Sequence, residues 1–148
     1  MGGIVERIQA DQTAALKARE RERVSALRLL TAELQNRRIE LGRDLTDEDA
    51  IEILTRALKQ RREAEEQFSR GGRPELAAKE AAEADVIREY LPEPIAEEEL
   101  GRLIDAAIAE TGATSMRDMG AVMGRLMPAI KGRAEGAVVS ARVKERLG

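Results

Sequence analysis

Clustered carboxylates are the side chains of this chain that come closest to acid–base catalysts. They occur in three places: Asp47 to Asp49, Glu63 with Glu65 and Glu66, and Glu97 to Glu99. Acidic residues in the first turn of a helix stabilise that helix, because they complement the partial positive charge of its N-terminus. The first and third clusters stand where helices are expected to begin, so this structural role accounts for them. We therefore assign no catalytic residue.

Cations near the end of the chain form a second set of side chains that could bind a ligand. They are Lys131, Arg133, Arg142, Lys144 and Arg146. Residues 117–148 carry 7 basic and 3 acidic side chains, on a chain of net charge −3. Such a segment is suited to the phosphates of a nucleic acid, and because it has no aromatic residue for stacking, contact would read backbone shape rather than sequence. A purely structural role also stays open, since Lys131 and Gly132 suit the end of a helix.

The segment before these cations, residues 117–130, has the pattern of a methionine-rich amphipathic helix. At about 100° per residue, one side collects Met119, Val122, Met123, Leu126, Met127 and Ile130. Gly120 and Gly124 border this stripe, and each lowers helix propensity by roughly 1 kcal/mol. Close approach of another backbone would offset that cost. Tight helix packing is the simplest explanation, and contact with a nucleic acid or a protein partner is the alternative.

Missing residue types narrow the chemistry further. The chain has no cysteine and no histidine, which removes thiol chemistry, zinc–thiolate sites and the usual general base near neutral pH. It has no glycine-rich phosphate loop and no exposed-nucleophile motif. We therefore expect no metal and no cofactor. No apolar run approaches the roughly 20 residues that cross a bilayer, and residues 1–16 lack a signal-peptide stretch, so we expect a cytosolic protein with no membrane partner.

The composition favours helices. Of the 148 residues, 43% are hydrophobic and 36% are charged, while the aromatics are only Phe68 and Tyr90. Apolar spacing and stop signals predict helices over residues 4–18, 20–41, 47–70, 74–90, 97–110, 116–130 and 137–147. The first of these is expected to bury Ile4, Ile8, Ala15 and Leu16. No strand pattern of useful length occurs, so the expected fold class is all-α.

Pro92 and Pro94 are expected to divide this helical chain. Proline stops a helix and stiffens the backbone. The apolar stripes on either side are separately complete. We therefore expect an N-terminal four-helix domain over residues 1–92, followed by a small three-helix C-terminal domain over residues 93–148.

Short motifs are spaced along the whole chain. They are Arg23 to Leu30, Lys59-Gln60-Arg61, Gly72-Arg73 with Leu76 and Lys79-Glu80, Tyr90-Leu91-Pro92, Asp118-Met119-Gly120 with Val122-Met123-Gly124, and Lys131-Gly132-Arg133. Together they resemble the GatB/YqeY family, and specifically its stand-alone YqeY-like proteins. The resemblance implies that the second domain is similar to the tail of the B subunit of the glutamine-dependent aspartyl/glutamyl-tRNA amidotransferase.

In that enzyme the tail contacts tRNA, while phosphorylation and amide transfer occur in other domains and subunits. The resemblance therefore implies a non-catalytic accessory protein of translation that binds tRNA or another structured RNA through the five cations, with Gly120 and Gly124 in the same surface. Two alternatives stay open. One is an adaptor that docks on a translation enzyme. The other is a participant in amide transfer, in keeping with the carbon–nitrogen ligase label, with glutamine as amido donor, that the family often carries; a partner would then supply the chemistry.

Overall fold

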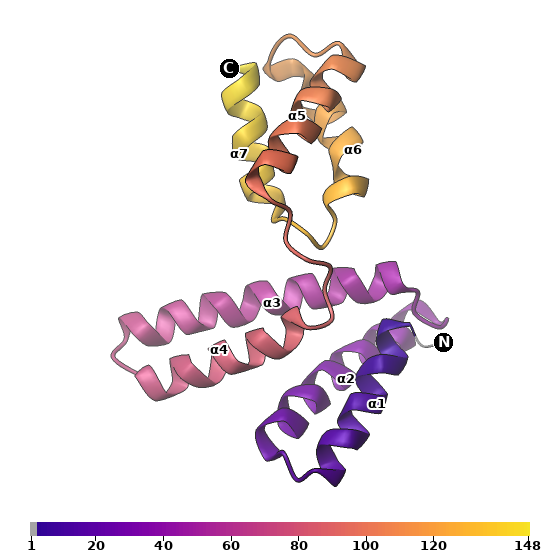
Figure 1. Ribbon diagram of the computed structural model, residues 1–148, viewed down its shortest axis with the longest axis vertical. Helices are drawn as coiled ribbons and strands as arrows, with labels where there is room; N and C mark the ends of the chain where they lie inside the picture. The colour runs from indigo at the N-terminus through magenta and orange to yellow at the C-terminus, as the bar shows by residue number, and fades with distance from the viewer. Residues whose placement is uncertain (1–2) are drawn as a thin grey trace. The chain divides into compact units, whose positions relative to one another are not determined.

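A computed structural model of the protein describes residues 3–148, and every regular element in that range is helical (Figure 1). The elements are α1 (Ile4–Lys17), α2 (Arg21–Leu41), α3 (Asp47–Arg70), α4 (Pro74–Arg88), α5 (Glu97–Thr111), the 3-10 helix η1 (Met116–Asp118), α6 (Met119–Ile130) and α7 (Gly136–Leu147). The expectation of an all-α protein is confirmed.

The chain divides into two compact units, Met1–Leu91 and Pro92–Gly148. Helices α1 to α4 belong to the first unit, and α5, η1, α6 and α7 belong to the second. The division falls at the segment where proline was expected to interrupt the helices. That each unit folds by itself as a domain stays a prediction.

Local signals set the helix ends. Gly42 has a φ of 68°, a left-handed conformation that glycine adopts without steric cost, and its N–H reaches the carbonyls of the last turn of α2. At the start of α3, Thr46 Oγ1 accepts the Asp49 N–H at 3.1 Å, and the Asp49 carboxylate accepts the Thr46 N–H at 2.9 Å. Ser115 and Asp118 form a second capping box, which begins the single turn η1 that leads into α6.

The first unit consists of two helical hairpins, α1 with α2 and α3 with α4 (Figure 1). Their shared core includes Ile8, Leu27, Leu30, Leu54 and Ile87. Leu16 does not join it: 57% of its surface is exposed, so the expectation that α1 buries this residue is wrong. The reason is helix geometry, because Leu16 lies about 100° around the helix from its buried neighbour Ala15.

Several polar links cross between helices of this unit, including two that join residues far apart in the sequence. Arg61 of α3 is largely buried and pairs with Glu33 of α2 at 3.0 Å and with Glu83 of α4 at 3.2 Å. One cation therefore holds three helices together. The second link joins Tyr90, directly after α4, to Asp11 of α1.

The second unit has its own core between α5, α6 and α7. The buried residues are Leu100, Ile104, Ala107, Val122, Leu126, Ile130, Val139 and Val143. Met127, expected on the inner stripe of α6, is instead 41% exposed. It lies about 100° around the helix from Leu126, which places it at the edge of the buried face.

Candidate functional site

The turn between α6 and α7 begins the candidate site. The Lys131 N–H donates to the Met127 carbonyl at 3.0 Å and closes α6, and Gly132 follows with a φ of 78°. The left-handed conformation expected of Gly132 is confirmed. Lys131 is exposed at this turn. The structural role proposed for the glycine is therefore real, and it leaves the lysine side chain at the surface.

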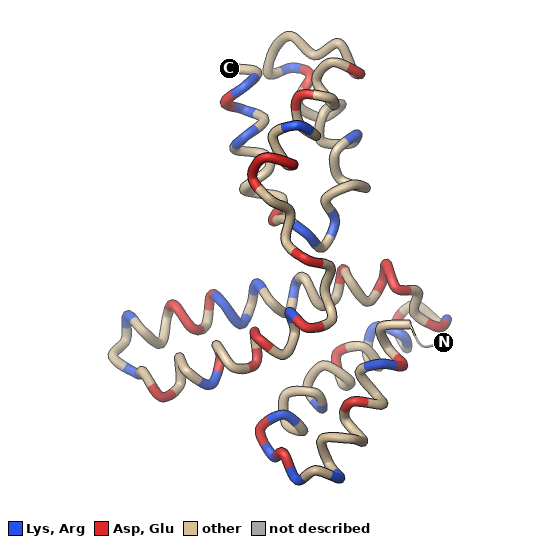
Figure 2. Tube along the Cα trace, viewed as in Figure 1, with Lys and Arg blue, Asp and Glu red and all other residues tan. Residues whose placement is uncertain are grey.

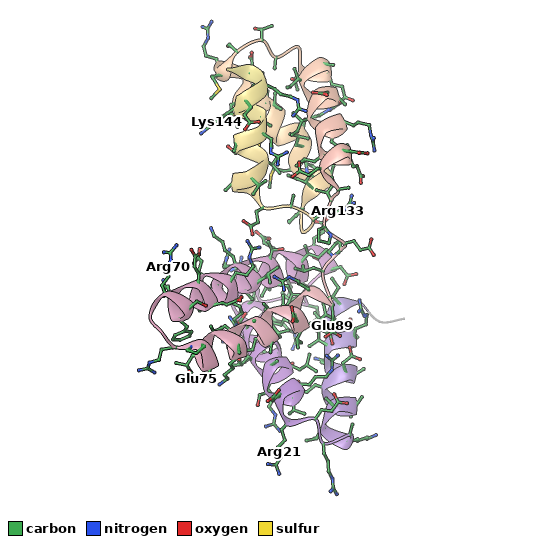
Figure 3. The ribbon with its side chains drawn as sticks, turned by 60° about the vertical axis from the view of Figure 1, so that its left-hand side comes forward. Arg21, Arg70, Glu75, Glu89, Arg133 and Lys144 are labelled. Carbon is green, nitrogen blue, oxygen red and sulfur yellow. The ribbon has the colours of Figure 1, made fainter. Side chains whose placement is uncertain are left out.

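Arg133 anchors the same turn to the segment before α5. Its carbonyl accepts the Ile95 N–H at 2.9 Å, and its Nε donates to the Glu93 carbonyl at 3.1 Å. Its Nη2 lies 3.4 Å from an oxygen of Glu99, in the first turn of α5. Figure 3 shows Arg133 at the end of this unit where the turn lies. The guanidinium is thus held by one backbone carbonyl and one carboxylate.

Arg142 and Arg146 lie one turn apart on the flank of α7 that meets α5. Arg142 forms a two-pronged ion pair with Glu97, in which Nη2 lies 2.6 Å from Oε1. The Arg146 Nε lies 2.8 Å from Asp105. Figure 2 shows the acidic first turn of α5 and the basic positions of α7 in this unit. The hydrogen bond from Arg142 lowers the pKa of Glu97 below its ordinary value.

Gly101 lies between the two acidic residues of this flank, four residues from each. A Cβ built on Gly101 would lie 3.4 Å from Arg146 Nη2. The missing side chain therefore leaves room for the arginine to lie across α5.

Lys144 is on the other side of α7. It lies about 160° around the helix from both Arg142 and Arg146, and Figure 3 shows its side chain extending away from the helices of this unit. The five predicted cations thus occupy the turn and two opposite flanks of α7. All five belong to the second unit, but only Arg142 and Arg146 share a flank of α7.

Gly120 and Gly124 are exposed on α6. Among the residues that the structure describes, no atom outside the local backbone lies within 4 Å of a Cβ built on either glycine. Tight packing against the other helices of the second unit is therefore the wrong explanation for them. Their cost in helix propensity is not offset inside the described structure.

The outer face of α6 around these glycines carries little charge. Ala121 and Pro128 are exposed with them, and Arg125 turns to Glu110 at 2.6 Å. Pro128 has no N–H, so the Gly124 carbonyl lacks its usual helical donor. This face is small, apolar and open to an approaching backbone.

Comparison with known proteins identifies the family. The sequence profile of the family described as Yqey-like protein matches residues 5–147. The chain belongs to the YqeY-like family.

Two relatives are similar to this YqeY-like chain. One is Altered inheritance of mitochondria protein 41, mitochondrial, of Pyrenophora tritici-repentis, which is 30% identical over 148 residues, covering 98% of this chain and 81% of the relative. The other is an uncharacterized protein of Schizosaccharomyces pombe, 30% identical over 79 residues, covering 53% of this chain and 64% of the relative. The first name places that relative in mitochondria. A cytosolic location for this chain stays a prediction.

Sequence reasoning missed the acidic partners of the cations in this YqeY-like chain. Glu97, Gly101 and Asp105 recur every fourth residue on α5, and Arg142 and Arg146 do so on α7. The two carboxylates are eight residues apart and the two arginines only four, so no matching spacing of charge in the sequence identifies these flanks as neighbours.

Two of the three acidic clusters lie where helices begin. Asp47 to Asp49 and Glu97 to Glu99 lie in the first turns of α3 and α5, where the helix dipole favours them. Across residues 3–148, no group of three or more acidic side chains is arranged to hold a metal ion. None of the helices described combines the length and apolar character that spanning a bilayer requires.

Proposed function

We propose that this chain is a non-catalytic accessory protein of translation whose C-terminal unit binds tRNA or another structured RNA. Membership of the YqeY-like family supports this, together with the resemblance of the unit to the tRNA-contacting tail of an amidotransferase. The observation that carries the proposal is the set of cations on the α6–α7 turn and α7. They are Lys131, Arg133, Arg142, Lys144 and Arg146.

The ion pairs of this surface are compatible with phosphate binding. Arg142 and Glu97 have side chains that are 37% and 67% exposed, and exposed ion pairs contribute only about 0–1 kcal/mol to stability. The fork with which Arg142 holds a carboxylate also fits two phosphate oxygens. An RNA phosphate would take the place of the carboxylate at little cost to the fold.

The mode of recognition follows from the side chains present. Residues 92–148 contain no aromatic residue, so bases have no stacking platform. Arginine and lysine would contact the phosphates, and the open backbone of α6 at Gly120 and Gly124 would admit close approach. Recognition would depend on the shape of a folded RNA.

If this chain takes part in amide transfer, its role would be to bind the RNA. The chain contains no cysteine or histidine to release ammonia from glutamine or to move protons near neutral pH. A partner would supply those groups. The purified chain should therefore show neither ammonia release from glutamine nor ATP turnover with charged tRNA, and turnover that follows the protein through purification would contradict this.

The test is a double substitution in the turn. Lys131→Ala with Arg133→Ala should weaken binding of bulk tRNA and flatten the slope of log affinity against log salt by roughly one to two units. The control, Lys17→Ala with Arg21→Ala, removes two exposed cations from the other unit and should leave both quantities nearly unchanged. Thermal unfolding checks that both variants are folded. The proposal is wrong if the wild type does not bind tRNA at low salt, or if the turn variant binds equally well.

A second candidate function is favoured by the outer face of α6. In a chain with 36% charged residues, Gly120, Ala121, Gly124 and Pro128 form an exposed surface without a charged member. This suits docking on a translation enzyme. Recovery of one protein from lysate that survives ribonuclease and is lost with Gly124→Leu would favour the adaptor. Recovery that depends on intact RNA would favour the first proposal.

A further inference from the structure

Carboxylates of α5 form ion pairs with three of the arginines that are proposed to bind RNA. Glu97 holds Arg142 through two hydrogen bonds, Asp105 lies 2.8 Å from the Nε of Arg146, and Glu99 lies 3.4 Å from Arg133. These acidic residues all come from one helix. The three arginines come from the turn and from α7.

The net charge of the second unit is close to zero. Residues 92–148 carry 8 basic and 9 acidic side chains, so their net charge is 8 − 9 = −1. The basic excess of residues 117–148 is therefore cancelled by the acidic residues that precede it. An approaching phosphate meets arginines that already have anionic partners, which weakens long-range attraction.

We propose that the acidic residues Glu97, Glu99 and Asp105 of α5 are an intramolecular competitor for RNA phosphates, so that RNA binds the arginines only by displacing them. This inference rests on the proposed function. It adds to that function a built-in restraint, in which weak RNA ligands are rejected and an RNA that offers several correctly spaced phosphates is accepted.

The arrangement of the two helices supports competition rather than a simple structural pair. Glu97, Gly101 and Asp105 lie on one flank of α5, and Arg142 and Arg146, which pair with the two acidic residues, lie one turn apart on α7. Because Gly101 has no side chain, Arg146 Nη2 can lie beside this flank, 3.4 Å from the place that a Cβ would take. Glu97 and Asp105 are about 12 Å apart along the axis of α5, and each pairs with an arginine that would otherwise be open to a phosphate.

The pairs are also exposed enough to exchange. The side chains of Arg146 and Asp105 are 38% and 65% exposed, and those of Arg133 and Glu99 are 31% and 42% exposed. Glu97 is ionised near neutral pH as an ordinary glutamate is, and the hydrogen bond from Arg142 lowers its pKa further. Displacement then costs an exposed ion pair and no buried contact.

The experiment compares two variants with the same change of charge. Glu97→Gln with Asp105→Asn removes two competing carboxylates, whereas Glu93→Gln with Glu98→Gln removes two exposed carboxylates of the same unit that are outside these three pairs. At about 0.15 M salt, the first variant should bind bulk tRNA roughly 5- to 30-fold more tightly than the wild type, since each freed pair corresponds to up to about fivefold. The slope of log affinity against log salt should steepen by about one to two units. The control should change affinity less than about twofold on the same scale.

The outcomes separate the two proposals. If the wild type binds tRNA and the first variant binds it no more tightly, the competition proposal is wrong and the proposed function stands. The same holds if the control variant gains as much affinity for tRNA as the first variant. If neither the wild type nor either variant binds at low salt, the proposed function fails and the competition fails with it. Binding by the first variant alone would support both. Circular dichroism confirms folding, and Glu97→Gln alone repeats the test if the double variant is unfolded.

Discussion

The Tyr90 hydroxyl donates a hydrogen bond to Asp11 Oδ2 at 2.5 Å, across 79 residues of the chain. Tyr90 is only 2% exposed. Arg23 lies beside this pair and forms a fork with Glu89, at 2.7 and 3.1 Å. The Arg7 guanidinium lies 5.1 Å from the centre of the tyrosine ring. The end of α4 is thereby joined to α1 and α2, close to where the first unit ends.

Removing the tyrosine hydroxyl should destabilise the first unit. Tyr90→Phe keeps the ring in the core and loses the bond to Asp11, so the free energy of unfolding should fall by about 1–2 kcal/mol. Urea unfolding followed by circular dichroism measures this. Asp11→Asn should lower it less, because a neutral acceptor remains. A Tyr90→Phe protein as stable as the wild type would show that the bond contributes nothing.

The same tyrosine predicts a loss of stability at alkaline pH. Burial, and then the hydrogen bond to Asp11, raise the pKa of Tyr90 well above its ordinary value of about 10. The unfolded state then loses the phenol proton first, so the stability due to neutral Tyr90 is present below about pH 10 and is lost as pH rises further. The difference in unfolding free energy between the wild type and Tyr90→Phe should shrink from about pH 9 to about pH 11.5. If this difference in unfolding free energy stays constant over the pH range, the prediction is wrong.

Asp49 predicts the opposite dependence at acid pH. The hydrogen bond from Arg43, at 2.6 Å, and that from the Thr46 backbone hold the pKa of Asp49 well below its ordinary value. Its contribution is therefore present above the unfolded pKa, near 4, and is lost as pH falls through the folded pKa. The stability advantage of the wild type over Asp49→Asn should narrow between about pH 5 and about pH 2. An advantage that grows toward low pH would reverse the assignment.

Gly124 and Gly112 allow the cost of backbone strain to be measured, because they differ in backbone conformation. Within residues 3–148, no heavy atom outside the local backbone lies within 4 Å of a Cβ built on Gly124 or Gly112, but Gly112 has a φ of 68° and Gly124 is inside α6. Gly124→Ala should raise the unfolding free energy by about 0.5–1 kcal/mol, and Gly112→Ala should lower it by about 1 kcal/mol. Thermal and urea unfolding report both. Destabilisation by Gly124→Ala would indicate a close contact at α6, as between two copies of the chain.

The segment after Leu91 should be the first site of proteolysis. It contains Pro92 and Pro94 and separates the two cores. Limited digestion should cut within residues 91–97 and release two helical fragments that resist further cleavage. First cleavage inside α2, with no stable fragment, would show that the units do not fold independently.

The sequence by itself determined where the helices begin and end. Gly42 ends α2, the capping box of Thr46 and Asp49 begins α3, and Pro74 begins α4. Each signal acts through the backbone groups of a single turn, so its effect does not depend on the rest of the fold. The same holds for Gly132 after α6. Apolar periodicity likewise indicated most of the buried residues.

Only the tertiary structure decided which flank of each helix meets a neighbour. Periodicity places Leu16 and Met127 near the apolar stripes, but the neighbouring helices leave both exposed. The partners of the arginines depend on the same choice. Glu97 and Arg142 are 45 residues apart, and nothing within one turn of either residue specifies the other. Such contacts arise when packing of the apolar stripes sets the rotation of each helix, and that rotation is a property of the assembled core.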